Sequence, residues 1–273
     1  MPPKRKAEDD GAMPSDRKMK TDDIFQSRII KFIVGKDQAE FNVHEDVIAK
    51  ISDPLRALVT NGMRESIEGK VVWEDVDMDT FTKLLQFAYE HDYTFTDPNE
   101  RRDDGKSFTM NQRIYLVEWG AYTWPTELSR ELADQFHDEA SDVVWHGAEN
   151  PFDQALYHSY GHYMSHVQLY ILADRYGVLA LMSLSVQKIC AMLVNNPLTK
   201  DLFSTVWKLL EFIWPKTTSE DRLKKLLLRF LLVDLRDALD LPVAAGVLTN
   251  IPDIAVALML MPSRGYWEEV SIV

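Results

Sequence analysis

The first regular pattern of apolar and polar positions predicts a β-hairpin. Residues Ile29–Val34 form an apolar, β-branched run that stops at Gly35-Lys36-Asp37, and residues Ala39–His44 then alternate apolar and polar side chains. Such alternation places every second side chain on a core, and a glycine between two such runs marks a turn. The segment is therefore predicted to be two antiparallel strands joined by a tight turn.

The period then becomes helical. Apolar residues at positions 47, 48, 51, 55 and 58 share one helix face, but Pro54 must open a helix, so two short helices are predicted to meet at Ser52. Residues 69–76 are predicted to form another strand. Asp79 is predicted to cap a helix with one apolar face, made of Phe81, Leu84, Leu85, Ala88 and Tyr89.

The chain is predicted to be strongly helical after residue 196. One apolar face there holds Leu202, Val206, Leu209, Leu210 and Ile213. Residues 217–220 match a capping box ahead of a second apolar stripe. The last apolar segment, 254–261, falls well short of the roughly 20 residues that span a bilayer, so it is expected to pack on the other helices.

Charge is concentrated in one part of the chain. The 273 residues contain 43 acids and 30 bases, a net charge of −13, and residues 97–150 alone hold 12 acids and 5 bases. An acidic surface repels phosphate backbones, so no direct nucleic-acid partner is expected. This segment also contains Trp119, Trp124 and Trp145. We expect a partly helical excursion, with residues 126–136 as the best helix candidate and the aromatics packing it onto the body.

Nothing in the composition indicates an oxidising or membrane environment. Cys190 is the single cysteine, and the first 23 residues contain no apolar signal-peptide core. We therefore expect a soluble intracellular protein.

The order of hairpin, two short helices, strand and amphipathic helix resembles the BTB/POZ domain, particularly that of many fungal proteins. The matching segments are 32–35, 41–44, 48–49, 52 with 55–56, 63–66, 71–73, 81–89 and 170–178 with 181. The resemblance implies an α+β BTB/POZ fold, a small mixed sheet capped by helices, with a long insertion and a helical C-terminal extension. The expected boundaries are a tail at 1–26, the first part of the domain at 27–96, the insertion at 97–166, the closing helices at 167–195 and the extension at 196–273.

The resemblance also implies residue roles. The positions that match the fold signature are His44, Ser52, Tyr89, Ala173, Asp174 and Tyr176. In BTB adaptors that recruit a cullin scaffold of the ubiquitin system, the corresponding loop carries an apolar residue, any residue and then Glu. Met63, Glu65 and the adjoining Ser66 are therefore candidates for such a contact, although Met63 could instead cover the domain's own core. Arg28 replaces an acidic residue that forms a charged pocket at some family dimer interfaces, which puts that pocket in doubt for a possible homodimer.

No residue pattern favours catalysis. His158, His162 and His166 are spaced four apart, so on one helix they would share a face, but the outer two would be about 12 Å apart, too far for three ligands to one ion. Aromatic packing is the preferred interpretation over a metal-dependent hydrolase. Cys190 lies among apolar neighbours and is interpreted as a small buried hydrophobe. We expect no catalytic residues, metal or cofactor.

The N-terminal tail contains two basic clusters separated by ten residues, typical of a bipartite nuclear localisation signal. They are Lys4, Arg5 and Lys6, followed by Arg17, Lys18 and Lys20. A solvated mixed-charge tail is the alternative. The leading hypothesis is a non-catalytic protein-interaction module that acts as a substrate adaptor for a cullin-based ubiquitin ligase. The alternative is a nuclear regulatory scaffold that recruits transcription or chromatin partners. Nucleus or cytoplasm is expected, with the nucleus slightly favoured.

Overall fold

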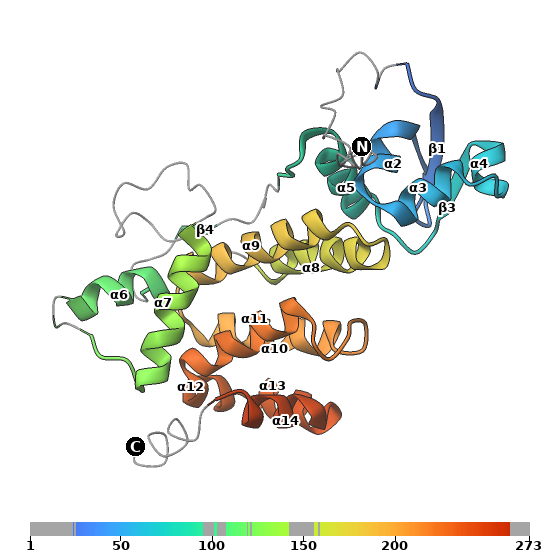
Figure 1. The fold of residues 1–273 in the computed structure, drawn as a ribbon. Helices are drawn as coiled ribbons and strands as arrows, with labels where there is room; N and C mark the ends of the chain where they lie inside the picture. Colours follow the sequence, from blue (N-terminus) through green and yellow to red (C-terminus); the bar gives the residue numbers. More distant parts are fainter. Residues whose placement is uncertain are drawn as a thin grey trace, which may run out of the picture.

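A computed structural model describes residues 24, 26–94, 101–102, 108–118, 120, 122–141, 156–157 and 159–262. Two lobes are visible in Figure 1, joined through the helix pair α8 and α9. The elements of the N-terminal lobe are β1 (Ile29–Val34), β2 (Ala39–His44), α2 (Glu45–Ile51), α3 (Asp53–Thr60), α4 (Arg64–Glu68), β3 (Lys70–Trp73) and α5 (Met78–Glu90).

The second, helical lobe contains the remaining helices. They are α6 (Met110–Glu118), α7 (Glu127–Ser141), α8 (Tyr160–Arg175), α9 (Leu179–Asn195), α10 (Lys200–Ile213), α11 (Arg222–Val233), α12 (Leu235–Leu239), α13 (Pro242–Asn250) and α14 (Pro252–Leu260). A separate two-stranded pairing joins β4 (Arg101–Arg102) to β5 (Leu156–Tyr157).

The N-terminal lobe is built on a three-stranded mixed sheet of order β2-β1-β3, in which β1 runs antiparallel to β2 and parallel to β3. The predicted hairpin is confirmed, with Ile29 opposite His44 and Val34 opposite Ala39. Its turn uses positive φ at Gly35 (73°), a conformation that glycine adopts without strain. Aromatic rings fill the core beneath the sheet, with Phe32 5.3 Å from Trp73 between ring centroids.

Two predicted details of this lobe are wrong. The strand predicted over 69–76 is limited to β3, because Gly69 takes the left-handed conformation that ends α4 and a turn follows Trp73. The cap of α5 is Asp77, not Asp79: its carboxylate accepts the backbone N–H of Thr80 at 2.8 Å. Helix α5 begins at Met78, so Asp79 lies inside the first turn, where it pairs with Lys83.

Helices α8 and α9 contribute to both cores. Leu169, Leu172 and Ala173 of α8 are buried in the N-terminal lobe, whereas Tyr163 and Val167 are buried in the helical lobe. A helix that is apolar on more than one face is expected where it is covered on both sides. The boundary predicted between 166 and 167 therefore falls inside a helix that serves both lobes.

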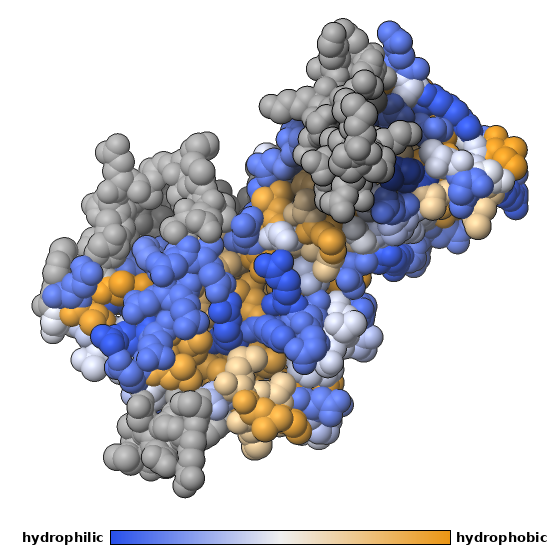
Figure 2. Space-filling model, viewed as in Figure 1, coloured by the Kyte–Doolittle hydropathy of each residue, from blue (hydrophilic) through white to orange (hydrophobic). Residues whose placement is uncertain are grey.

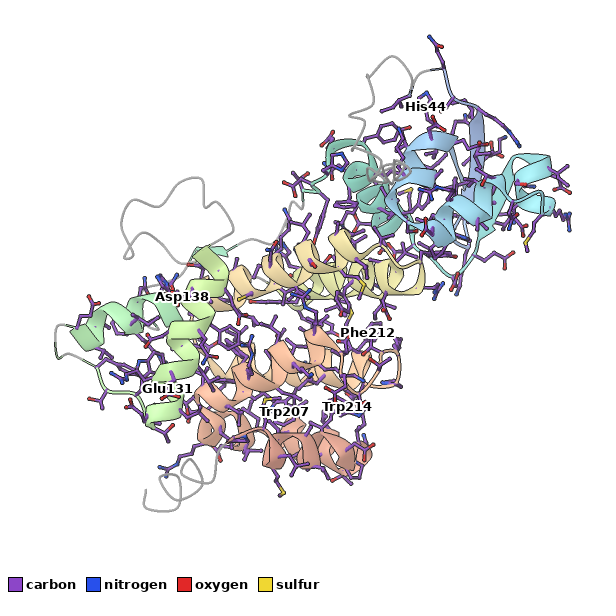
Figure 3. All side chains as sticks on the ribbon, viewed as in Figure 1. His44, Glu131, Asp138, Trp207, Phe212 and Trp214 are labelled. Carbon is purple, nitrogen blue, oxygen red and sulfur yellow. The ribbon has the colours of Figure 1, made fainter. Side chains whose placement is uncertain are left out.

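The helical lobe consists of stacked helix pairs, with α8 and α9 above α10 and α11, and α13 and α14 at the far end (Figure 1). Trp207 of α10 lies in the middle of this stack, where its Nε1 donates to the backbone oxygen of Ala238 at 2.9 Å (Figure 3). Helix α11 is capped by Asp221 rather than by the predicted box at 217–220, because its carboxylate accepts the N–H of Lys224.

The insertion is part of this second lobe. Helix α7 covers most of the predicted segment 126–136, continues to residue 141 and packs on α9 and α11. Helix α6, which was not predicted, packs on α7 and α9. Trp124 is buried in the same core, while Trp119 and Trp145 lie outside the described residues. Among the described residues no single helix is long and apolar enough to cross a membrane; α13 and α14 pass that test only together, by length and composition, as a pair bent by 103°.

Candidate protein-interaction surface

The short helix α4 and the turn before it carry the residues predicted to contact a partner. Three hydrogen bonds hold this helix, two within its own turn and one to the first strand's flank at Arg28. The hydroxyl of Ser66 accepts the N–H of Gly62 at 2.8 Å and donates to the backbone oxygen of Met63 at 3.1 Å. The guanidinium of Arg28 donates to the backbone oxygen of Ser66 at 2.6 Å. A helix of five residues has little stability of its own, so these bonds hold it in place.

Gly69 allows the Arg28 contact. A Cβ atom added at Gly69 would lie 2.6 Å from the Arg28 Nη2 atom, closer than non-bonded atoms approach. Its φ of +63° also favours glycine. Arg28 thus binds α4, and its Nη1 atom also lies 3.8 Å from the Oε2 atom of Glu45. Arg28 therefore has a structural role at the position where some family members have an acid.

The three predicted contact residues differ in exposure. Met63 is 63% exposed and Glu65 is half-buried, whereas Ser66 is only 5% exposed and uses its hydroxyl inside the turn. Met63 therefore does not cover the domain's own core. A fourth residue, Ile67, is 73% exposed on the same helix and was missed by the sequence reasoning. The sequence feature that could have identified Ile67 is its place four residues after Met63, a spacing that puts two apolar side chains on one helix face.

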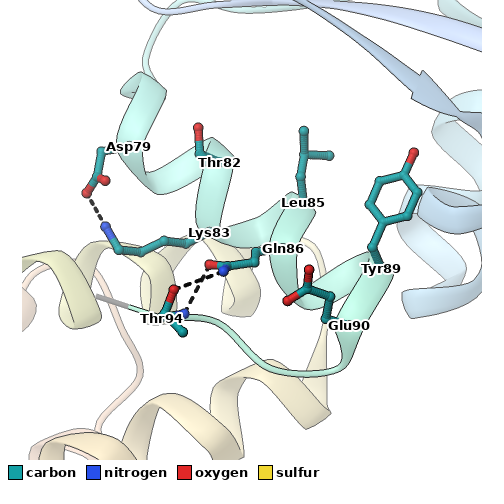
Figure 4. A pocket seen from close by; sticks show the side chains of 8 residues that line it. All are labelled: Asp79, Thr82, Lys83, Leu85, Gln86, Tyr89, Glu90 and Thr94. Carbon is teal, nitrogen blue, oxygen red and sulfur yellow. Dashed lines mark hydrogen bonds and ion pairs between the residues drawn. The ribbon is translucent and has the colours of Figure 1, made fainter. Parts of the chain in front are cut away.

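A second feature of the lobe is a shallow groove of about 570 Å³ along the outer side of α5 (Figure 4). Gln86 and Thr94 close one wall: the Gln86 amide donates to the Thr94 hydroxyl at 2.9 Å and accepts the Thr94 N–H at 3.0 Å. Tyr89 lines the other end, where its hydroxyl lies 2.8 Å from Nδ1 of His44. Most of the side chains that line the groove are polar, and two of them are hydrogen-bonded to each other, whereas α4 and its N-cap expose the apolar side chains of Ile67 and Met63.

The remaining positions of the fold signature have structural roles. Ser52 caps α3 by accepting the N–H of Leu55 at 3.2 Å, as its position at the predicted helix break suggested. Ala173 is fully buried in the N-terminal core. Tyr176 stacks on Trp73 with ring centroids 4.5 Å apart, which ties the end of α8 to the sheet. Asp174 is exposed; partial burial, followed by the nearby Asp221 carboxylate, raises the pKa of its carboxyl.

Two of the three histidines singled out in the sequence, His162 and His166, pack at the junction of the two lobes. Helix α8 begins at Tyr160, so only His162 and His166 lie on it, with their rings stacked 5.3 Å apart; the side chain of His158 lies outside the described residues. His166 Nδ1 is 2.7 Å from the hydroxyl of the buried Tyr93. Within the part of the chain that the structure describes, no three His, Cys, Asp or Glu side chains are placed to hold a metal ion.

Cys190 is buried in the helical lobe, and burial raises the pKa of its thiol to about 12. Such a thiol stays protonated at neutral pH and is a weak nucleophile. The two basic clusters predicted to direct nuclear import, at residues 4–6 and 17–20, lie outside the described residues.

Comparison with protein families identifies the domain that forms the N-terminal lobe. The BTB/POZ domain model matches residues 30–112, from β1 into α6. The predicted closing helices at 167–195 lie beyond this match, although α8 and α9 complete the core of the same lobe. A search of curated proteins finds no match to the chain. The α+β fold predicted for residues 29–89 is confirmed, with the small mixed sheet covered by helices.

Proposed function

We propose that this chain, whose residues 30–112 match the BTB/POZ domain, a protein-interaction module, is an adaptor that links partner proteins to a cullin scaffold of the ubiquitin system. BTB domains are generally non-enzymatic. Exposed Met63, at the N-cap of α4, and half-buried Glu65, in its first turn, have the form that the family uses for this contact, and they carry the proposal.

The physical case for this contact is preorganisation. Ser66 and Arg28 hold α4 in position before a partner arrives, so little ordering is required on binding. Met63 supplies an apolar anchor that a groove could bury, and Glu65 supplies a charge that steers and orients the partner. An anchor beside a polar rim is the usual arrangement of an interaction hot spot.

The test is a binding titration of the full chain with purified cullin. Met63→Ala is expected to weaken binding about tenfold or more, the typical cost of removing a hot-spot side chain. Glu65→Gln is expected to slow association and to reduce its dependence on salt. Leu179→Ala is the matched control, because Leu179 is 72% exposed at the start of α9, away from α4. Absence of binding by the unchanged protein would contradict the proposal.

A second function is favoured by the two basic clusters in the tail. A nuclear regulatory scaffold would use residues 4–6 and 17–20 for import and the BTB/POZ domain to gather nuclear partners or a second copy of the chain. Replacing Lys4, Arg5 and Lys6 with alanine is expected to shift a fluorescently tagged chain from the nucleus to the cytoplasm. A tagged chain that stays cytoplasmic in both forms would count against this function.

A further inference from the structure

We propose that Ile67 is a second apolar anchor of the α4 surface, so that the partner must offer a groove for two side chains on one helix face, bordered by a basic residue. The inference rests on the proposed cullin contact. It adds to the family pattern a residue that the pattern does not include, and it specifies the shape and charge of the partner's site.

The geometry places Met63 and Ile67 together. The N–H of Ile67 donates to the backbone oxygen of Met63 at 2.9 Å, the bond that closes one helical turn. Residues four apart on a helix are neighbours on one face. Both side chains are more than half exposed, 63% for Met63 and 73% for Ile67. Figure 2 shows hydrophobic side chains at the tip of the N-terminal lobe where α4 lies.

The charges around this pair favour a basic partner residue. Arg64 and Glu68 bind each other at 2.8 Å and neutralise one another. The backbone oxygen of Glu65 accepts the N–H of Gly69, and its half-buried side chain carries a carboxylate between the two apolar residues in sequence. The surface therefore presents two apolar anchors and one carboxylate, which matches an apolar groove with a Lys or Arg at its edge.

Ile67 is well suited to this role. Its β-branched side chain has few rotamers, so burial at an interface costs less conformational entropy than burial of the longer Met63. Its exposure shows that it contributes little to the domain's core. Truncation should accordingly leave the fold intact, which makes the residue a clean probe of binding.

The test measures the affinity of purified cullin for four forms of the full chain: unchanged, Met63→Ala, Ile67→Ala and Leu179→Ala. We expect Ile67→Ala to weaken binding about five- to fiftyfold, comparable to Met63→Ala, and Leu179→Ala to bind as the unchanged chain does. Thermal melting should be unchanged in all four. Ile67→Asp, which would place a second carboxylate in the apolar groove, is expected to abolish measurable binding.

The outcomes separate the two proposals. If Met63→Ala weakens binding and both Ile67 variants bind as the unchanged chain does, the second anchor is wrong and the cullin contact stands. If the unchanged chain does not bind cullin, the proposed function fails and this inference falls with it. Equal weakening by Leu179→Ala would also overturn the inference, because the effect would not be specific to α4.

Discussion

The two lobes share one helix pair but differ in what holds them together. The N-terminal lobe encloses an aromatic cluster beneath a three-stranded sheet, whereas the helical lobe is a stack of helix pairs, and the only other described sheet is the two-stranded pairing of β4 with β5 in the insertion. The proposed interaction surface on α4 belongs to the first lobe. The insertion interrupts that lobe in sequence but packs in the second. The chain thus leaves the N-terminal lobe after α5, builds part of the helical lobe and then returns through α8 to complete both.

The contacts of α7 show that the insertion is a structural part of the helical lobe. Phe136 is fully buried, with its ring centroid 5.9 Å from that of Phe230 in α11. Arg229 donates to both carboxylate oxygens of Glu139 at 2.7 Å. The acidic residues Glu131 and Asp138, labelled in Figure 3, lie on the same helix. On α7 the acidic residues therefore lie on the outer face, while Leu132, Ala133 and Phe136 are buried.

The largest expected effect comes from breaking this contact. Phe136→Ala should lower the free energy of unfolding by about 3–5 kcal/mol, because it empties a fully buried ring site. Urea unfolding monitored by circular dichroism would measure the loss. Glu131→Ala, an exposed change on the same helix, is the control and should alter stability by less than about 0.5 kcal/mol. A loss below about 1 kcal/mol for Phe136→Ala would mean that the insertion is not part of the core.

A smaller effect is expected in the N-terminal lobe. Tyr89→Phe removes the hydroxyl that accepts the backbone N–H of His44 at 3.3 Å and lies 2.8 Å from its Nδ1, while keeping the ring. The expected cost is about 1 kcal/mol, within the usual range for hydrogen bonds at a partly exposed site. The same urea titration applies, and binding by α4 should be unchanged. A variant as stable as the original would show that this pair adds nothing to the lobe.

The smallest effect is expected at the end of α8, where Asp174 faces the helical lobe. The pKa of its carboxyl is raised, first by burial and then by Asp221. The folded state therefore keeps this proton to higher pH than the unfolded state does, and stability falls as the pH rises from the ordinary aspartate pKa of 3.8 through the raised pKa. Asp174→Asn should remove that fall in stability and raise the free energy of unfolding at pH 7 by at most about 0.5 kcal/mol, since the side chain is largely exposed. Melting temperatures at pH 4 and pH 7 would test this; an unchanged difference between them would contradict it.

The sequence predicted local structure better than long-range packing. Alternation over residues 29–44 and Pro54 determined the hairpin and the two short helices, because those signals act within a few residues. The membership of α7 in the helical lobe depends on contacts with α11, about 90 residues later, such as Glu139 with Arg229. The exposure of side chains could not be predicted from the pattern either. Nothing in the sequence distinguished Ser66 from Met63 and Glu65 as a buried residue, and only the fold turns Ser66 inward.

We propose that α4 of the N-terminal lobe, rather than the helical lobe, contacts the cullin scaffold. Hydrogen–deuterium exchange of the full chain with and without saturating purified cullin tests this directly, since amides at a buried contact exchange more slowly. The account predicts slower exchange across residues 61–69 and unchanged exchange across α10 to α14. Unchanged exchange at residues 61–69, or slower exchange confined to the helical lobe, would contradict it.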